Sequence, residues 1–217
     1  MTADLFEGVL DAGPARQEIA EGAILLRGFA GAFEHDLIPA LRAVVEQAPF
    51  RHMHTPGGRQ MSVAMTNCGN FGWVTDRTGY RYDAVDPETG RAWPAMPAVF
   101  LLLAQQAATR AGFAGFAPDA CLINLYEPGS RMSLHQDRDE RDFDQPIVSV
   151  SLGLPAVFLF GGLKRSDKPR RFRLQHGDVV VWGGPSRLFF HGVAPLTEGE
   201  HDSLGRQRIN LTFRKAR

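Results

Sequence analysis

The sequence contains little cysteine, no long apolar run and no excess of charge. Its two cysteines, Cys68 and Cys121, form no Cys-x-x-Cys pair, so a zinc–thiolate site is not indicated and reduced thiols are expected. No stretch approaches the roughly 20 apolar residues of a membrane-spanning helix. Residues 1–7 have neither the basic start nor the apolar core of an export signal. These features favour a cytoplasmic protein without a membrane partner.

Charge is balanced over the chain. The 24 Lys and Arg residues equal the 24 Asp and Glu residues, so the overall charge gives no preference for nucleic acid. The stretch 163–173 is an exception, because it holds six basic residues and one acidic residue. Such a density of positive charge suits a phosphate backbone. A solvated hairpin tip is the alternative explanation of the same residues.

The N-terminal half contains two predicted helices and an irregular stretch. Residues 23–29 predict a short strand and residues 34–48 a helix. Residues 49–93 are rich in Gly and Pro and lack a long apolar run, which is typical of a lid of hairpins and loops. Pro94 is expected to open a second helix, closed by Gly112. The apolar faces expected are Leu37, Ile38, Leu41, Val44 and Val45 in the first helix, and Val99, Phe100, Leu102, Leu103 and Ala107 in the second.

From residue 119 onward the pattern is one of strands separated by Gly, Pro and Asp turns. The predicted strands are Cys121–Tyr126, Ile147–Leu152, Val157–Phe160, Arg171–Leu174, Val179–Trp182, Leu188–Val193 and Arg206–Phe213. Such a run after two helices predicts an α+β fold, a double-stranded β-helix (jelly roll) buttressed by helices on one sheet. We expect a single domain over residues 1–217, with the lid at about 49–93 and the jelly roll at about 115–217.

The most distinctive short pattern is His135-Gln136-Asp137, which is followed much later in the chain by His191. Two imidazoles and one carboxylate can occupy one face of an octahedral Fe(II), which leaves positions for a cosubstrate and dioxygen. In a strand, His135 and Asp137 would point to one side and Gln136 to the other. The bare pattern is weak evidence, because short His-x-Asp sequences also occur by chance.

The C-terminal strand strengthens this interpretation. Polar residues alternate there with apolar ones, in the order Arg208, Ile209, Asn210, Leu211, Thr212, Phe213 and Arg214. The alternation places two guanidiniums on one face, ~20 Å apart at their Cα atoms by a rise of about 3.3 Å per residue. Guanidinium groups pair with carboxylates in a fork, so the two could grip a small dianion. Surface arginines are the alternative, but the coincidence with the His-x-Asp pattern favours a 2-oxoglutarate site.

Longer motifs add specificity. They are Thr55-Pro-Gly-Gly58, Met61-Ser-Val-Ala-Met-Thr-Asn-Cys-Gly69, Asp119-Ala-Cys-Leu-Ile-Asn124, His135-Gln-Asp137, Ile147-Val-Ser-Val-Ser-Leu-Gly-Leu-Pro155, His176-Gly-Asp-Val-Val-Val-Trp-Gly-Gly184 and Asn210-Leu-Thr-Phe-Arg214. With these motifs the chain, from about residue 23 to residue 214, resembles the AlkB family of Fe(II)/2-oxoglutarate-dependent nucleic-acid demethylases, and its bacterial founding branch above all.

The resemblance implies a metal site and a cosubstrate site. Fe(II) is expected to bind to His135, Asp137 and His191, with 2-oxoglutarate and O2 as cosubstrates. The residues expected to hold 2-oxoglutarate are Asn124, Tyr126, Arg208, Asn210 and Arg214. Among them, Arg208 is expected to pair with the distal carboxylate and Arg214 to lie near the metal-chelating end. Without the resemblance, Asn124 and Tyr126 would be the polar face of an edge strand.

The resemblance also implies substrate contacts, at Trp73, Tyr80, Arg81, Tyr82, Asp139 and Arg165. Trp73 and Tyr80 are large rings in the Gly-rich lid, where an unpaired base could stack on them. A small aromatic core of the lid is the alternative. The Asp139 carboxylate suits a cationic methylated base, since it can accept a hydrogen bond from an exocyclic amine; a simple turn residue is the alternative.

The implied activity is oxidative demethylation of 1-methyladenine and 3-methylcytosine, with release of succinate, CO2 and formaldehyde. The enzyme is expected to be a monomer. Its expected partner is single-stranded or locally opened DNA, with RNA as a further substrate. The activity would directly reverse alkylation damage. A dioxygenase of protein side chains or small molecules would need neither Trp73 nor Tyr80. A jelly-roll module that binds zinc or a sugar would not need the pair of arginines.

Three positions depart from the pattern of the resemblance. Arg59 and Phe190 stand where tyrosine is expected, and Met132 stands where leucine is expected. The metal and cosubstrate residues are intact. The departures therefore bear on substrate preference and on how tightly the nucleic-acid strand is bound.

Overall fold

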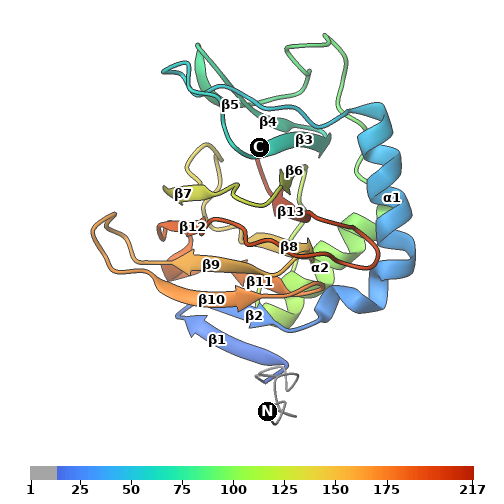
Figure 1. Cartoon of the computed structure of the whole chain (residues 1–217). Helices are drawn as coiled ribbons and strands as arrows, with labels where there is room; N and C mark the ends of the chain where they lie inside the picture. Colours follow the sequence, from blue (N-terminus) through green and yellow to red (C-terminus); the bar gives the residue numbers. More distant parts are fainter. Residues whose placement is uncertain (1–13) are drawn as a thin grey trace, which may run out of the picture.

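The computed structural model describes residues 14–217, which form two antiparallel sheets, a separate two-stranded hairpin and two α-helices (Figure 1). The expectation about export concerns residues 1–7 and lies outside the described residues. The larger sheet has the strand order β1-β2-β11-β8-β13-β6-β3. Its strands are β1 Arg16–Ala20, β2 Ala23–Leu26, β3 Ala64–Gly69, β6 Ala120–Tyr126, β8 Ile147–Gly153, β11 Val179–Trp182 and β13 Arg208–Arg214.

The smaller sheet has the order β10-β9-β12-β7 and lies against the larger one. Its strands are β7 Met132–His135, β9 Ala156–Phe160, β10 Arg170–Leu174 and β12 His191–Val193. Apolar side chains from both sheets form one buried cluster, in which Phe158 and Phe160 of the smaller sheet meet Trp182 of the larger. Two facing antiparallel sheets with such an interior confirm the predicted jelly roll.

Two helices cover the outer face of the larger sheet, α1 Glu34–Gln47 and α2 Ala98–Ala111 (Figure 1). The apolar face predicted for α1 is confirmed at Leu37, Ile38, Leu41 and Val44. The start predicted for α2 is wrong, because the helix begins four residues after Pro94, and Met96 precedes a second proline that disfavours helical backbone. Gly112 does end α2, in the left-handed conformation at φ 104°. Leu102, predicted to be buried, is 48% exposed.

The seven strands predicted after residue 119 are all present; Val179–Trp182 has the predicted ends, and the other six are shifted at one or both ends. The largest shift is in β12, which begins at His191 rather than at residue 188. The short strand β7 was not predicted as a separate element. The short 3-10 helices η1 Phe29–Phe33 and η2 Gly184–Ser186 were also not predicted. The strand predicted over residues 23–29 ends early, because Gly28 adopts a left-handed conformation and starts η1.

Part of the region predicted as a lid, residues 49–93, belongs to the core. β3 pairs with β6 along its whole length and its side chains are almost all buried, so the expectation of hairpins and loops is wrong there. The hairpin of β4 Gly72–Asp76 and β5 Gly79–Asp83 does form a separate two-stranded sheet, which lies beside β3 (Figure 1). No helix among residues 14–217 has both the length and the apolar character that crossing a membrane requires.

Candidate active site

Three side chains that could hold a metal ion converge at the mouth of the jelly roll. One nitrogen or oxygen from each of His135, Asp137 and His191 lies within 4.8 Å of the others. Each histidine places its Nε2 3.7 Å from an oxygen of Asp137. His135 and His191 face each other across the register of β7 and β12, and their ring centroids are 4.4 Å apart. The structure thus brings together the three residues predicted from the sequence.

The placement of Asp137 differs from the prediction in one respect. β7 ends at His135, so Asp137 does not reach the site by strand alternation but from the irregular segment that follows. The side chain of Gln136 donates a hydrogen bond to the carbonyl of Leu188 and does not belong to the metal-binding group. Holding Asp137 in place therefore requires contacts other than a strand ladder.

Both histidines are arranged to offer Nε2 as a ligand atom. Nδ1 of His135 donates to the carbonyl of Ser133 at 2.8 Å, and Nδ1 of His191 donates to the carbonyl of Phe189 at 3.0 Å. Such bonds fix the ring orientation and leave the Nε2 lone pair free. Burial lowers the pKa of His191 to about 4, so this imidazole is neutral near pH 7. A neutral imidazole is the form that binds a metal.

The carboxylate of Asp137 is ionised and paired with an arginine. Arg214 donates to Oδ2 of Asp137 through Nε at 2.9 Å and through Nη2 at 2.7 Å. Burial alone would raise the pKa of Asp137, but nearby positive charge, that of Arg214 first, outweighs burial and holds that pKa well below its usual range. The three residues offer two imidazole nitrogens and one carboxylate, the ligand set that suits Fe(II) with open positions.

At the other end of β13, a second arginine is buried without a carboxylate. Arg208 is 1% exposed, and its Nη2 donates to the hydroxyl of Ser151 at 2.9 Å, but its Nε and Nη1 are buried without a partner among the described residues. Its guanidinium lies over the ring of Tyr126, 4.9 Å from the centroid. Burial lowers the pKa of Arg208. The alternative of solvated surface arginines is therefore wrong.

The residues around Arg208 fit a bound dicarboxylate. Because a buried charge is costly unless it is paired, the free nitrogens of Arg208 call for an anion. Asn124 faces the same interior, and its side-chain amide can donate to a bound carboxylate. Asn210 is directly opposite Asn124, but its side chain is already bonded to the Ser149 hydroxyl at 2.8 Å and the Val150 carbonyl at 2.9 Å. The predicted cosubstrate residues thus share one buried face.

A cavity of about 650 Å3 opens beside the metal site. It is lined by His135, Asp137 and Arg214, and by four of the predicted substrate residues, which are Trp73, Tyr80, Asp139 and Arg165. Nε1 of Trp73 donates to Oδ2 of Asp139 at 2.7 Å, and the rings of Trp73 and Tyr80 stack with centroids 5.7 Å apart. Tyr80 is nevertheless 50% exposed, so this pair forms a wall of the cavity more than a closed core.

Two predicted substrate residues do not reach this cavity. Tyr82 is buried opposite Trp73 in the register of β4 and β5, and its hydroxyl donates to Oε1 of Glu140 at 2.6 Å. Arg81 points to the opposite face of the hairpin and forms ion pairs with Asp76 and Asp83. Strand alternation explains both placements, because Arg81 must face away from Tyr80 and Tyr82.

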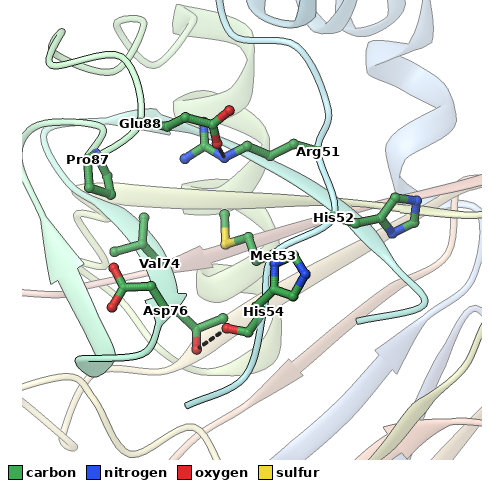
Figure 2. A pocket seen from close by; sticks show the side chains of 9 residues that line it. Arg51, His52, Met53, His54, Val74, Asp76, Pro87 and Glu88 are labelled. Atoms are coloured by element: carbon green, nitrogen blue, oxygen red, sulfur yellow. Dashed lines mark hydrogen bonds and ion pairs between the residues drawn. The ribbon is translucent and has the colours of Figure 1, made fainter. Parts of the chain in front are cut away.

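A second, smaller hollow of about 240 Å3 lies on that opposite face of the hairpin (Figure 2). Its lining includes Arg51 and Glu88, whose side chains meet at 3.0 Å, and Arg51 also pairs with Asp86. Asp76 is paired with Arg81. The charges around this hollow are already compensated within the protein, unlike the charge of Arg208.

Sequence reasoning missed two charged residues behind the metal site. Glu140 and Arg187 are buried and lie 3.1 Å apart. Glu140 also approaches Nε of Arg214 at 3.4 Å, so it belongs to the same charged cluster as Asp137. Arg187 could have been noticed as the one charged residue in the apolar stretch between β11 and β12. Glu140 gave no such signal, because it lies in a run of mixed charges.

Comparisons with known proteins agree with this site. The chain matches the 2OG-Fe(II) oxygenase superfamily over residues 22–214. It is 58% identical over 213 residues to the alpha-ketoglutarate-dependent dioxygenase AlkB of Escherichia coli K12, covering 98% of this chain and 97% of the relative. The solved structure of OsALKBH1 superposes with a TM-score of 0.79 at 28% identity, covering 92% of this chain and 99% of the other. The DNA N(6)-methyladenine demethylase ALKBH1C of Arabidopsis thaliana is 35% identical over 161 residues, covering 62% of this chain and 35% of the relative.

Jelly roll, triad and buried arginine together define an Fe(II)- and 2-oxoglutarate-dependent dioxygenase, the class expected from the sequence. Within that class the chain belongs to the AlkB family. Its cofactor is Fe(II), and its cosubstrates are 2-oxoglutarate and O2.

Proposed function

We propose that this dioxygenase demethylates N-methylated bases, 1-methyladenine and 3-methylcytosine, in single-stranded or locally opened DNA, and in RNA as a further substrate. The observation that carries the proposal is the cavity in which Trp73, Tyr80 and Asp139 stand beside the metal-binding residues. The kinship with proteins named as DNA demethylase and AlkB dioxygenase supports it. The activity would reverse alkylation damage directly.

Each residue then has a distinct task. His135, Asp137 and His191 would hold Fe(II), Arg208 would pair with the distal carboxylate of 2-oxoglutarate, and Asn124 would lie along the same cosubstrate. When bound, the metal and 2-oxoglutarate activate dioxygen for hydroxylation of an N-methyl group, which is then released as formaldehyde. The protein supplies orientation and a dry interior, since the face of β13 that carries Arg208 and Arg214 is wholly buried.

The two aromatic rings at the cavity suit a base taken out of its stack. A base must leave its duplex before a metal inside a pocket can reach a methyl group on its ring nitrogen. Trp73 and Tyr80 offer faces on which it can stack, and Asp139 offers a carboxylate that favours a cationic ring. Asp139 is held in place by Trp73. Tyr82 and Arg81 support the hairpin, and any contact of Arg81 with substrate would lie outside the cavity.

The primary test compares succinate formation with a methylated oligonucleotide, its unmethylated counterpart and a peptide. We expect only the methylated strand to raise succinate formation above the rate without substrate, with formaldehyde released in an amount equal to that increase. Equal stimulation by the peptide would favour the alternative of a protein-modifying dioxygenase. No turnover with any of them, in protein reconstituted with Fe(II), would contradict the oxidative chemistry itself.

A second test concerns Trp73. We expect Trp73→Ala to weaken binding of methylated single strand by ~1–3 kcal/mol, the range for one lost stack, while 2-oxoglutarate turnover without DNA persists. The matched control is Trp93→Ala, which removes a tryptophan that is buried in the same region and does not line the cavity. If Trp73→Ala lowers the melting temperature as Trp93→Ala does but leaves affinity intact, Trp73 is only a core residue.

The basic hairpin between β9 and β10 is proposed to contact the flanking strand. Arg165 lines the cavity and is anchored to the Leu134 carbonyl at 2.7 Å, and Lys168 is exposed nearby in the sequence. We expect replacement of both to weaken binding to methylated and plain strands alike and to flatten the salt dependence by up to ~2 in slope. An unchanged slope would place this hairpin away from the phosphates.

The monomeric state and the cytoplasmic location also belong to this proposal. The buried thiols of Cys68 and Cys121 lie directly opposite each other in β3 and β6 and are not joined, which suits a reducing compartment. Light scattering of the purified protein at working concentration would test the monomer.

A further inference from the structure

Arg187 is the buried arginine that none of the roles above has used. It follows η2, between β11 and β12, and is 3% exposed. Its Nε donates to the Gln145 carbonyl at 3.0 Å, its Nη1 donates to the Asp137 carbonyl at 3.0 Å, and its Nη2 meets Oε2 of Glu140 at 3.1 Å. Each nitrogen of this guanidinium thus has an acceptor, and all three acceptors belong to the segment 137–145.

The backbone of the segment 137–145 has little other support. It contains no helix or strand, and one backbone hydrogen bond joins it to a distant segment, from Arg141 to the Ala216 carbonyl at 3.4 Å. Yet it carries Asp137, which lies against the two metal-binding histidines, and Asp139, which is bonded to Trp73. A planar guanidinium with a fixed fork is well suited to hold three points of an irregular segment at once.

The partner of Arg187 extends this support to the hairpin. Glu140 accepts a hydrogen bond from the Tyr82 hydroxyl at 2.6 Å and lies 3.4 Å from Nε of Arg214, which in turn pairs with Asp137. One buried cluster of charges therefore reaches from β5 to the metal-binding carboxylate. Loss of the Arg187 guanidinium would remove one of the cations paired with Glu140. It would also remove the hydrogen bond that holds the Asp137 carbonyl.

We infer that Arg187 is a positioning residue, which fixes the segment 137–145 so that Asp137 faces the two histidines while Asp139 faces Trp73. Contacts behind a metal ligand of this kind typically change metal affinity or activity by about 10–100-fold when they are lost. The part that concerns Asp137 rests on the geometry of the metal site alone. The part that concerns Asp139 rests on the proposed function.

The first experiment measures metal affinity without any turnover. Mn(II), which takes the same nitrogen and oxygen ligands, is titrated into metal-free protein, and a thermal melt of each variant is recorded alongside. We expect Arg187→Met to raise the Kd for Mn(II) about 10–100-fold. The matched control is Arg51→Met, which breaks another arginine–carboxylate pair, partly buried, at the hollow of Figure 2 and away from the metal-binding residues. It should lower the melting temperature but leave the Kd unchanged.

Two conservative variants keep the inference testable if Arg187→Met does not fold. Arg187→Lys keeps the charge beside Glu140 but cannot reach three acceptors, so we expect an intermediate Kd for Mn(II). Glu140→Gln keeps the volume and removes the charge, and should also raise the Kd. If Arg187→Lys and Glu140→Gln bind Mn(II) as the wild type does while melting lower, Arg187 is a structural residue only and the inference is wrong.

A third readout separates this inference from the proposed substrate. With saturating metal, Arg187→Lys should lower kcat/KM for methylated oligonucleotide more than it lowers 2-oxoglutarate turnover without DNA, because Asp139 is displaced as well. An equal loss in both would confine the role of Arg187 to Asp137. Failure of methylated DNA as a substrate would leave the Mn(II) result standing, so the two proposals fail separately.

Discussion

The two ends of strand β13 carry the same side chain in opposite electrostatic situations. Arg214 lies against Asp137 and close to Glu140, and although burial would lower its pKa, these carboxylates raise it. Arg208 has no carboxylate within the described residues, and burial lowers its pKa. The charge of Arg214 is therefore paired within the protein, whereas the charge of Arg208 would be paired by a bound anion. Charge that is already paired serves structure, and charge that is buried but unpaired marks a binding site.

The largest effect should come from removing the carboxylate that pairs with Arg214. Asp137→Ala and His135→Ala should both abolish Fe(II)-dependent turnover, because each removes one of three protein ligands. Only Asp137→Ala also leaves Arg214 without its main partner, so it should be less stable than His135→Ala by ~3–5 kcal/mol. Chemical denaturation of the two metal-free variants measures the difference. Equal stabilities would show that the Arg214 pair contributes nothing net.

The next effect concerns the unpaired end. Arg208→Met should weaken 2-oxoglutarate binding by several kcal/mol, which is more than about 100-fold, because the dianion loses its buried counter-charge. Calorimetric titration of 2-oxoglutarate into Mn(II)-loaded protein gives the value. Without ligand, Arg208→Met should be as stable as the wild type or more stable, whereas Arg214→Met should be clearly less stable. A marked loss of stability in ligand-free Arg208→Met would remove the contrast between the two arginines.

A smaller effect is expected from pH, in metal-free protein. Folding lowers the pKa of His191 to about 4 from an ordinary 6.5, so between these values the unfolded chain binds more protons than the folded one. Stability should therefore be fully present above pH 6.5 and decline as the pH falls toward 4, by at most about 3 kcal/mol. His191→Gln should flatten this decline when unfolding is followed across the window. His176, whose pKa burial also lowers, contributes equally in both proteins. An unchanged slope in His191→Gln would mean that other groups carry the dependence.

The smallest effect concerns the single side-chain bond that orients Arg208. Ser151→Ala removes the hydroxyl that accepts from Nη2 of Arg208. We expect a loss of about 1 kcal/mol in 2-oxoglutarate affinity, the usual size of one hydrogen bond, with metal affinity unchanged. The same calorimetric titration checks it. A loss as large as that of Arg208→Met would show that Ser151 binds the cosubstrate itself.

The sequence predicted the parts of the site that repeat regularly or match long motifs. Alternation in β13 correctly placed Arg208 and Arg214 on one face, and the order of strands predicted the jelly roll. It could not show that this polar face is the interior, because alternation does not say which face meets solvent. Nor could it place Asp137, whose position depends on Arg214 and Arg187 rather than on strand geometry.

The hairpin region shows a second limit of sequence reasoning. The frequent Gly and Pro residues of 49–93 predicted a lid of hairpins and loops over the whole region, yet β3 is a strand of the larger sheet. Pairing with β6, far along the chain, overrides local composition there. Arg81 was carried over as a substrate residue from the resemblance, while strand alternation turns it toward Asp76. The contacts proposed for Trp73, Tyr80, Asp139 and Arg165 stay predictions until binding is measured.

The position of β13 between β8 and β6 has a consequence for how the protein opens. A strand paired on both sides near the middle of a sheet exchanges its amide hydrogens only when the whole domain unfolds, whereas a two-stranded hairpin such as β4–β5 opens far more often. Deuterium uptake should therefore be slowest at residues 209–213 and much faster at 72–83. The protein would then combine a slowly exchanging sheet, which carries Arg208 and Arg214, with a hairpin that opens without unfolding of that sheet.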